Sequence, residues 1–272
     1  YAVTDFFHSL HDTIRNSPND AYVYYEERRS YADMYGNMRK INAALAGYRN
    51  ERIALYAIKG FPTYCAIFAI LLSGNTWVPV NPQMPDARNA DMIRIAAPKV
   101  ILTDRELPGE IAGYAKDAGS EVIFLDQLVS GGKAVDFDID RIDVDQTAII
   151  FFTSGSTGTP KGVEMLHSNY INTVNNILEA VPFRKGEVFA DYHDLGFVLC
   201  IPYLFGCVFT ESAFSPGIKE RERMIPLHHI AANKVTVLVT VPSSISRFRS
   251  LRPEGIENSS IRIMCLAGEP FH

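Results

Sequence analysis

The chain carries a run of small polar residues that could surround an anion. Residues 153–162 read Thr-Ser-Gly-Ser-Thr-Gly-Thr-Pro-Lys-Gly and follow directly after the apolar run 148–152. Gly155 and Gly158 let main-chain N–H groups approach a ligand closely, and the neighbouring hydroxyl groups add hydrogen-bond donors. Lys161 adds a mobile positive charge. The run therefore predicts a loop that binds the phosphates of a nucleotide.

The same run excludes one large class of nucleotide-binding protein. A Walker A loop ends in Gly-Lys followed by Ser or Thr, whereas here Pro160 precedes Lys161 and Gly162 follows it. GTPases and kinases of the Walker A type are therefore disfavoured. A flexible surface turn is the alternative for such a run. The apolar strand before it and the helical pattern that begins near His167 favour a phosphate loop instead.

A second segment combines a histidine and an aspartate. Tyr192-His193-Asp194 stands before an apolar stretch, which is typical of polar chemistry at the mouth of a pocket. Asp194 also fits the N-cap of a helix that begins near Leu195. The two interpretations are compatible, and both stay open at this point.

These segments resemble, in the same order, those of the adenylate-forming superfamily, which includes acyl-CoA synthetases, fatty acyl-AMP ligases, luciferases and peptide-synthetase adenylation domains. Residues 153–162 are similar to its phosphate-loop signature, and residues 71–82 to its early Val-Pro motif. Residues 192–197 are similar to the segment that lines the site of the acid. Residues 261–270 are similar to the strand and Gly-Glu-Pro turn that pack against adenine. The resemblance covers nearly the whole chain.

The resemblance implies roles for individual positions. Lys161 and Thr153 would act in catalysis, and His193 and Asp194 would bind the carboxylic acid. No residue is expected to be a metal ligand. The implied nucleotide site consists of Thr153, Ser154, Gly155, Ser156, Thr157, Gly158, Thr159, Lys161, Gly268, Glu269 and Pro270.

The reaction that the resemblance implies has two steps. The carboxylate of the substrate attacks the α-phosphate of ATP and pyrophosphate leaves; the acyl-adenylate is then passed to a thiol of CoA or of a phosphopantetheine carrier protein. Fixed donors around the departing pyrophosphate favour the transition state. Mg²⁺ would bridge the phosphates, and its usual protein ligand belongs to family motifs that do not occur before His272. We therefore expect the N-terminal portion of a larger enzyme, poorly active alone.

The identity of the acid leaves alternatives. The His-Asp-Leu-Gly context of Asp194 is similar to that of enzymes that activate acyl or aryl acids, which we favour. In amino-acid-activating relatives an aspartate in this segment pairs with the α-amine of the substrate, so an amino acid is the runner-up. A nucleotide-binding or docking module without catalysis is a further alternative.

Composition and charge restrict the possible partners. The chain of 272 residues has 47% hydrophobic and 21% charged residues and a net charge of −5, which gives no basic excess for nucleic acid or an anionic membrane. The uncharged segment 195–210 is too short for a membrane span and contains Pro202 and Gly206. The four cysteines, 65, 200, 207 and 265, lack a Cys-x-x-Cys spacing, which favours reduced thiols in a cytoplasmic protein.

Strand-like and helix-like segments alternate along the chain. Strands are expected at 52–58, 100–103, 121–125, 235–240 and 261–266, and helices at 63–72, 86–97, 108–118, 168–181, 219–232 and 243–251. This alternation predicts an α/β fold of two lobes, with largely parallel sheets flanked by helices. The Asp-rich segment 129–145 indicates a surface connection or a short edge strand. We therefore expect a first lobe at 1–145 and a second, with the phosphate loop, at 146–272.

Overall fold

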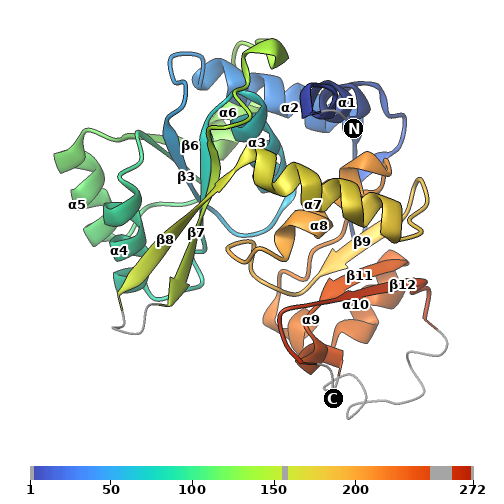
Figure 1. Cartoon of the computed structure of the whole chain (residues 1–272). Coiled ribbons are helices and arrows are strands. Elements are labelled where there is room, and N and C mark those ends of the chain that lie inside the picture. Colours follow the sequence, from blue (N-terminus) through green and yellow to red (C-terminus); the bar gives the residue numbers. More distant parts are fainter. Residues whose placement is uncertain (1–2, 155–158, 246–258, 271–272) are drawn as a thin grey trace. The chain divides into compact units, whose positions relative to one another are not determined.

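The protein, represented by a computed structural model that describes residues 3–154, 159–245 and 259–270, forms two compact units. One unit comprises Tyr1–His11 and Tyr35–Asn172, and the other Asp12–Met34 and Thr173–His272. Each unit holds a six-stranded, mostly parallel sheet with helices packed on it (Figure 1). The α/β fold of two largely parallel sheets is thus confirmed.

The elements fall in the order that the alternation predicts, with additions near the N-terminus and between residues 125 and 214. The helices are α1 (Val3–Asn16), α2 (Tyr31–Ala44), α3 (Phe61–Leu72), α4 (Asp86–Ala96), α5 (Gly109–Ala118), α6 (Leu125–Ser130), the 3₁₀ helix η1 (Ile139–Arg141), α7 (His167–Ala180), α8 (Cys200–Phe209), α9 (Glu220–Met224) and α10 (Pro226–Asn233). The strands are β1 (Asp20–Tyr24), β2 (Glu27–Ser30), β3 (Arg52–Tyr56), β4 (Thr76–Val80), β5 (Val100–Thr103), β6 (Glu121–Phe124), β7 (Thr147–Ser154), β8 (Pro160–Leu166), β9 (Val188–Asp191), β10 (Ala213–Phe214), β11 (Val237–Thr240) and β12 (Ile263–Leu266). The helix expected at 243–251 lies largely outside the described residues.

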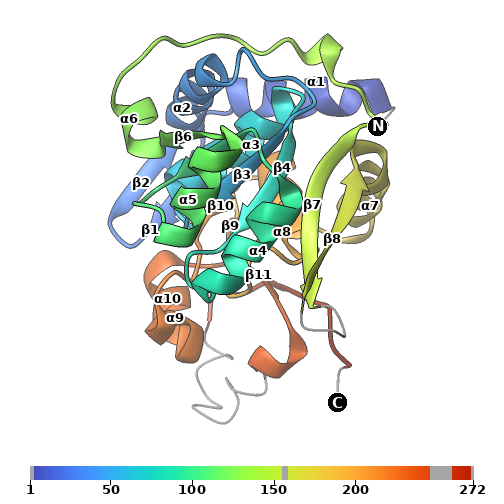
Figure 2. The same cartoon turned by 90° about the vertical axis from the view of Figure 1, so that its left-hand side faces the viewer.

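The sheet of the first unit has the strand order β6-β5-β3-β4-β7-β8, and only the β7–β8 pair in it is antiparallel. Helices α4 and α5 cover one face, where Ile93 packs with Ala54 and Val78 (Figure 2). Helix α3 is apolar around its whole circumference, because it is buried on nearly every side. It ends before Gly74, whose φ of 70° is a left-handed conformation that glycine adopts without a steric penalty.

The sheet of the second unit has the order β12-β11-β9-β10-β1-β2, in which only the edge pair β1–β2 is antiparallel. Ile230 of α10 packs with Ala190 and Leu238 on one face. On the other face lies α8, where Gly206 approaches the ring of Phe189: a Cβ on Gly206 would lie 3.4 Å from that ring. Since alternate residues of a strand point to opposite faces, β9 is buried on both sides.

The strands beside the phosphate loop belong to the first sheet. Trp77 of β4 pairs with Ile149 of β7, and β8 returns antiparallel to β7. The compact units therefore divide near residue 172, and not at the boundary of 145 and 146 that the Asp-rich segment suggested. In that segment Phe137 and Ile139 turn inward and the aspartates turn outward, but no edge strand forms; the chain makes the 3₁₀ turn η1.

The helix expected at 219–232 is divided. Helix α9 ends at Met224, Ile225 has φ −132° and ψ 70°, and α10 begins at Pro226. Proline removes a helical hydrogen bond and disfavours the α conformation of the preceding residue, which explains the break.

Among the residues that the structure describes, every helix is too short or too polar to traverse a bilayer.

Candidate functional site

The predicted phosphate loop is the tip of the β7–β8 hairpin. The strand pairs run Phe152 opposite Gly162, Thr153 opposite Lys161 and Ser154 opposite Pro160, so the last three residues of the run 153–162 belong to a strand. Proline is tolerated as the first residue of a strand. Strand pairing therefore includes part of the run that was predicted to be a loop.

The hairpin is buried along most of β7, whereas several described residues near the connection of its two strands are exposed. Residues 148–152 of β7 are buried in the sheet, whereas Thr153, Thr159 and Lys161 are exposed. Thr153 lies directly opposite Lys161. Directly opposed residues in an antiparallel pair project from the same face, so both side chains leave one face of the hairpin. Within the described part of the chain, neither side chain forms a hydrogen bond or ion pair. Both groups are available to a phosphate.

Four predicted nucleotide-binding residues, Gly155, Ser156, Thr157 and Gly158, lie outside the described residues. Gly162 shows why the strand pair is tight at this point. A Cβ on Gly162 would lie 3.2 Å from Cγ2 of Ile150 and 3.5 Å from the ring of Phe152. Glycine thus lets β8 pack closely over the apolar side chains that hold the hairpin base.

The predicted acid-binding residues lie in the second unit, directly after β9. Asp194 is half-buried, and its Oδ1 accepts a hydrogen bond from the N–H of Gly196 at 2.6 Å. Helix α8 begins only at Cys200, so Asp194 caps a turn and is not the N-cap of that helix. The His193 side chain is only 7% exposed and its Nε2 lies 3.7 Å from Oδ2 of Asp191.

The Gly-Glu-Pro turn follows β12 in the same unit. Gly268 has a φ of 90°, a left-handed conformation that favours glycine, and residues 268–270 are exposed. Oε2 of Glu269 accepts a hydrogen bond from the N–H of Ser243, which follows β11, at 2.9 Å. Since β9, β11 and β12 are parallel neighbours, this turn and Asp194 share the carboxyl edge of one sheet.

Two groups at this edge were missed by the sequence analysis. Asp191 ends β9 with a fully buried side chain, and a charged residue that closes an apolar strand was the available signal. His229 is fully buried in α10 and its Nδ1 lies 2.9 Å from the hydroxyl of Tyr192. Its neighbour His228 is exposed, because adjacent residues of a helix point in different directions.

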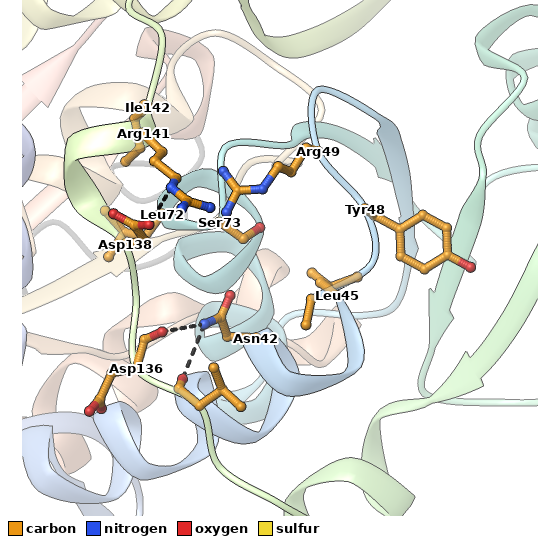
Figure 3. A pocket seen from close by; sticks show the side chains of 12 residues that line it. Asn42, Leu45, Tyr48, Arg49, Leu72, Ser73, Asp136, Asp138, Arg141 and Ile142 are labelled. Atoms are coloured by element: carbon orange, nitrogen blue, oxygen red, sulfur yellow. Dashed lines mark hydrogen bonds and ion pairs between the residues drawn. The ribbon is translucent and has the colours of Figure 1, made fainter.

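A pocket of about 160 Å³ lies elsewhere, in the first unit. It is bounded by the ends of α2 and α3 and by residues 135–142 (Figure 3). Nδ2 of Asn42 donates to the carbonyl oxygens of Val135 and Asp136, each at 3.1 Å, and Arg141 pairs with Asp138 at 2.5 Å. These contacts hold the Asp-rich connection against α2. None of the predicted site residues lines the pocket.

No group of three or more His, Cys, Asp or Glu side chains that could hold a metal ion occurs in residues 3–154, 159–245 and 259–270. Mg²⁺ is bound in nucleotide sites mainly by phosphate oxygens and water, with one or two carboxylates. A magnesium ion held mainly by phosphate oxygens and water needs no such group of side chains.

The chain is similar to known proteins over nearly its whole length. The family of AMP-binding enzymes matches residues 10–272. The chain is 29% identical over 253 residues to syringomycin synthase SyrB1 of Pseudomonas syringae pv. syringae, covering 88% of this chain and 39% of that protein. It is 28% identical over 285 residues to an L-proline–[L-prolyl-carrier protein] ligase of Pseudomonas fluorescens, covering 96% and 55%. The chain thus spans only part of the length of these relatives.

Solved structures show the same fold. The N-terminal subdomain of Klebsiella oxytoca NpsA in complex with 3-hydroxybenzoyl-AMSN superposes with a TM-score of 0.80 at 17% identity, covering 99% of this chain and 67% of that chain. O-succinylbenzoate coenzyme A synthetase (MenE) of Bacillus subtilis in complex with AMP superposes with a TM-score of 0.80 at 19% identity, covering 96% of this chain and 68% of that chain. With a family match over nearly its whole length and homologues that are synthetases and ligases of the adenylate-forming superfamily, the chain belongs to the AMP-binding enzymes.

Proposed function

We propose that the protein activates a carboxylic acid with ATP to an acyl-adenylate, releases pyrophosphate, and then transfers the acyl group to the thiol of CoA or of a carrier-protein phosphopantetheine, with AMP as the leaving group. The observation that carries the proposal is the position of Lys161 directly opposite Thr153 beside the phosphate loop. In the first step an oxygen of the carboxylate bonds to the α-phosphorus while the bond from that phosphorus to the pyrophosphate oxygen breaks.

The hairpin supplies what this step requires. Negative charge grows on the departing pyrophosphate, and a lysine with a neighbouring hydroxyl at a fixed position stabilises it without reorganisation at the moment of reaction. The base of the hairpin is buried, so the strand pair presents both groups from a rigid support. Lys161 thus acts as an electrostatic group, and Thr153 as a hydrogen-bond donor.

The acid would bind at the carboxyl edge of the second sheet, near Asp194. Ligands of open α/β sheets bind at this edge. After Asp194 the chain presents Phe197, 62% exposed, and Val198, 58% exposed. Apolar side chains at this place support an acyl or aryl acid as the substrate, and the exposed Gly-Glu-Pro turn on the same edge is the proposed place of the adenine.

An amino acid is the second candidate. The half-buried carboxylate of Asp194 is the kind of group with which an α-amine would pair, and one relative is named as a ligase of L-proline. None of the four cysteines forms a disulfide, which supports the expected reducing, cytoplasmic setting.

Acid-dependent exchange of radioactive pyrophosphate into ATP tests the proposal. The natural full-length protein is incubated with separate pools of fatty, aryl and amino acids. Exchange that depends on one pool establishes adenylation and identifies the substrate class. If no pool supports exchange while ATP still binds, the proposal is overturned in favour of a nucleotide-binding module without catalysis.

A further inference from the structure

Tyr192 is the first residue after β9 and stands two residues before Asp194. Its hydroxyl lies 2.9 Å from Nδ1 of His229, and the two rings meet edge to face at a centroid distance of 5.7 Å. Burial raises the pKa of Tyr192 well above its ordinary value, so the phenol keeps its proton at neutral pH.

His229 is itself held on its other side. Its Nε2 lies 3.4 Å from Oγ of Ser215, a buried residue that follows β10. Phenol and serine hydroxyls can both donate and accept, so either neutral tautomer of the imidazole satisfies both contacts. The half-buried Tyr192 and the buried His229 and Ser215 therefore form a polar chain that ties three segments together.

The ring of Tyr192 also rests on a glycine. A Cβ on Gly217 would lie 2.2 Å from Cδ1 of Tyr192 and 2.6 Å from Cε1, distances that no methyl group tolerates. The N–H of Gly217 donates to the carbonyl oxygen of Asp191 at 2.9 Å. The loop after β10 is thus fastened to the end of β9 and forms a seat for the Tyr192 ring.

The strand alternation explains why this matters for the acid site. Val188 and Tyr192 pack with the cluster around Ile230 of α10, whereas Phe189 and His193 face α8, where the His193 ring lies 6.2 Å from that of Tyr203. When the side chain of Tyr192 is held on the α10 side of the sheet, the directions of the next side chains, His193 and Asp194, are fixed as well.

We propose that Tyr192, His229 and Gly217 form a clamp that positions the acid-binding residues His193 and Asp194, so that loss of the clamp weakens use of the acid but not of ATP. The inference rests on the proposed function of this segment. None of the three is a catalytic residue; they act through the orientation of the residues that follow Tyr192. A placement error of about 1 Å is enough to lower turnover substantially.

The first test compares variants of the natural full-length protein by acid-dependent pyrophosphate exchange. Tyr192→Phe removes one hydroxyl, and we expect the KM for the acid to rise about 3- to 10-fold, the effect of one lost hydrogen bond, with the KM for ATP unchanged. Tyr31→Phe is the matched control, because this buried phenol donates to the carbonyl oxygen of Ser212 at 2.7 Å, away from the clamp. It should leave the KM for the acid unchanged.

His229 provides a rescue and a coupling test. His229→Leu should act like Tyr192→Phe, whereas His229→Asn keeps a polar atom near the place of Nδ1 and should restore most of the affinity. The double variant of Tyr192→Phe and His229→Leu should lose no more than either single one, because the two groups share one interaction. Equal KM values for the acid in Tyr192→Phe and Tyr31→Phe would overturn the clamp.

A second readout does not depend on activity. Hydrogen exchange of the amides at 193–197, which include the Gly196 N–H that Asp194 caps, should be faster in Tyr192→Phe than in Tyr31→Phe. If the wild type shows no acid-dependent exchange of pyrophosphate, the proposed function fails, and amide exchange still decides on the clamp. Equal amide exchange in the two variants would refute it.

Discussion

Thr153 and Lys161 face each other across the β7–β8 pair, although seven residues separate them in the sequence. The antiparallel return of the chain makes the first and the ninth residue of the polar run neighbours on one face of the hairpin. Strand pairing therefore places the two side chains on one face, and a shift of the register by one residue would turn one of them to the opposite face.

Replacing Lys161 with Met should abolish most of the adenylation activity. We expect pyrophosphate exchange to fall about 10²-fold or more, because a charged group that stabilises the departing pyrophosphate is lost. Lys116→Met, at an exposed lysine of α5, is the control and should keep wild-type exchange. Wild-type exchange in Lys161→Met would remove this residue from the proposed nucleotide site.

Asp194→Asn separates the two substrate classes. If an acyl or aryl acid is the substrate, no amine needs a charged partner. Pyrophosphate exchange should then change by less than about tenfold, because the amide oxygen of Asn can still accept the hydrogen bond from the Gly196 N–H. A loss of about 10²-fold or more, confined to amino acids, would show that Asp194 pairs with an α-amine. Exchange with each acid pool is measured for the variant and the wild type.

Two glycine-to-alanine variants should change stability in opposite directions. Gly217→Ala forces the Tyr192 ring to move and should lower the free energy of unfolding by about 1–3 kcal/mol. Gly113→Ala lies within α5, where a Cβ meets nothing within 4 Å, and should raise it by roughly 0.5–1 kcal/mol. Urea denaturation followed by circular dichroism measures both, and a Gly217→Ala protein as stable as the wild type would contradict the packing described for Tyr192.

His167 should make the first unit sensitive to acid. Burial lowers the pKa of this histidine from 6.5 to about 4; its Nδ1 contacts the Tyr170 hydroxyl at 2.7 Å and its ring lies edge to face on Phe7. The unfolded state binds the proton more readily than the folded state does. The contribution of neutral His167 to the free energy of unfolding is therefore fully present above pH 6.5 and decreases as the pH falls toward 4. The loss at pH 5 amounts to about 2 kcal/mol.

The comparison of unfolding at pH 7 and pH 5 checks this expectation. His167→Asn should show a smaller difference between the two pH values than the wild type. His228→Asn, at the exposed histidine of α10, should show the wild-type difference. The same pH dependence in all three proteins would rule out a role for His167.

The buried strands of the first sheet could be predicted from the sequence, and the hairpin could not. Val100–Thr103 was predicted at its observed bounds, because a short apolar run between polar segments is typical of a buried parallel strand. Strand β8 was missed, since its residues are mostly exposed and Pro160 and Gly162 are typical of loops. Its structure depends on pairing with β7, a tertiary contact that local residue preferences do not encode.

The acid site shows the same limit. His193 and Asp194 were predicted to bind the acid from their residue types and the motif around them. The connection of Tyr192 with His229 joins residues that are 37 positions apart, and only the packing of α10 against β9 brings them together. The sequence around Gly217 has no distinguishing local pattern. Glycine is required there because the ring of Tyr192 lies where a Cβ would be.

The strand order of the second sheet delays the pairing of its N-terminal strands during synthesis. Tyr22 of β1 pairs with Phe214 of β10, so 192 residues must be added after Tyr22 before its partner exists. At about 5–20 residues per second the wait is about 10–40 s. During this interval β1 and β2 leave the ribosome with an unpaired edge, which makes them a site where a chaperone or a second nascent chain could bind.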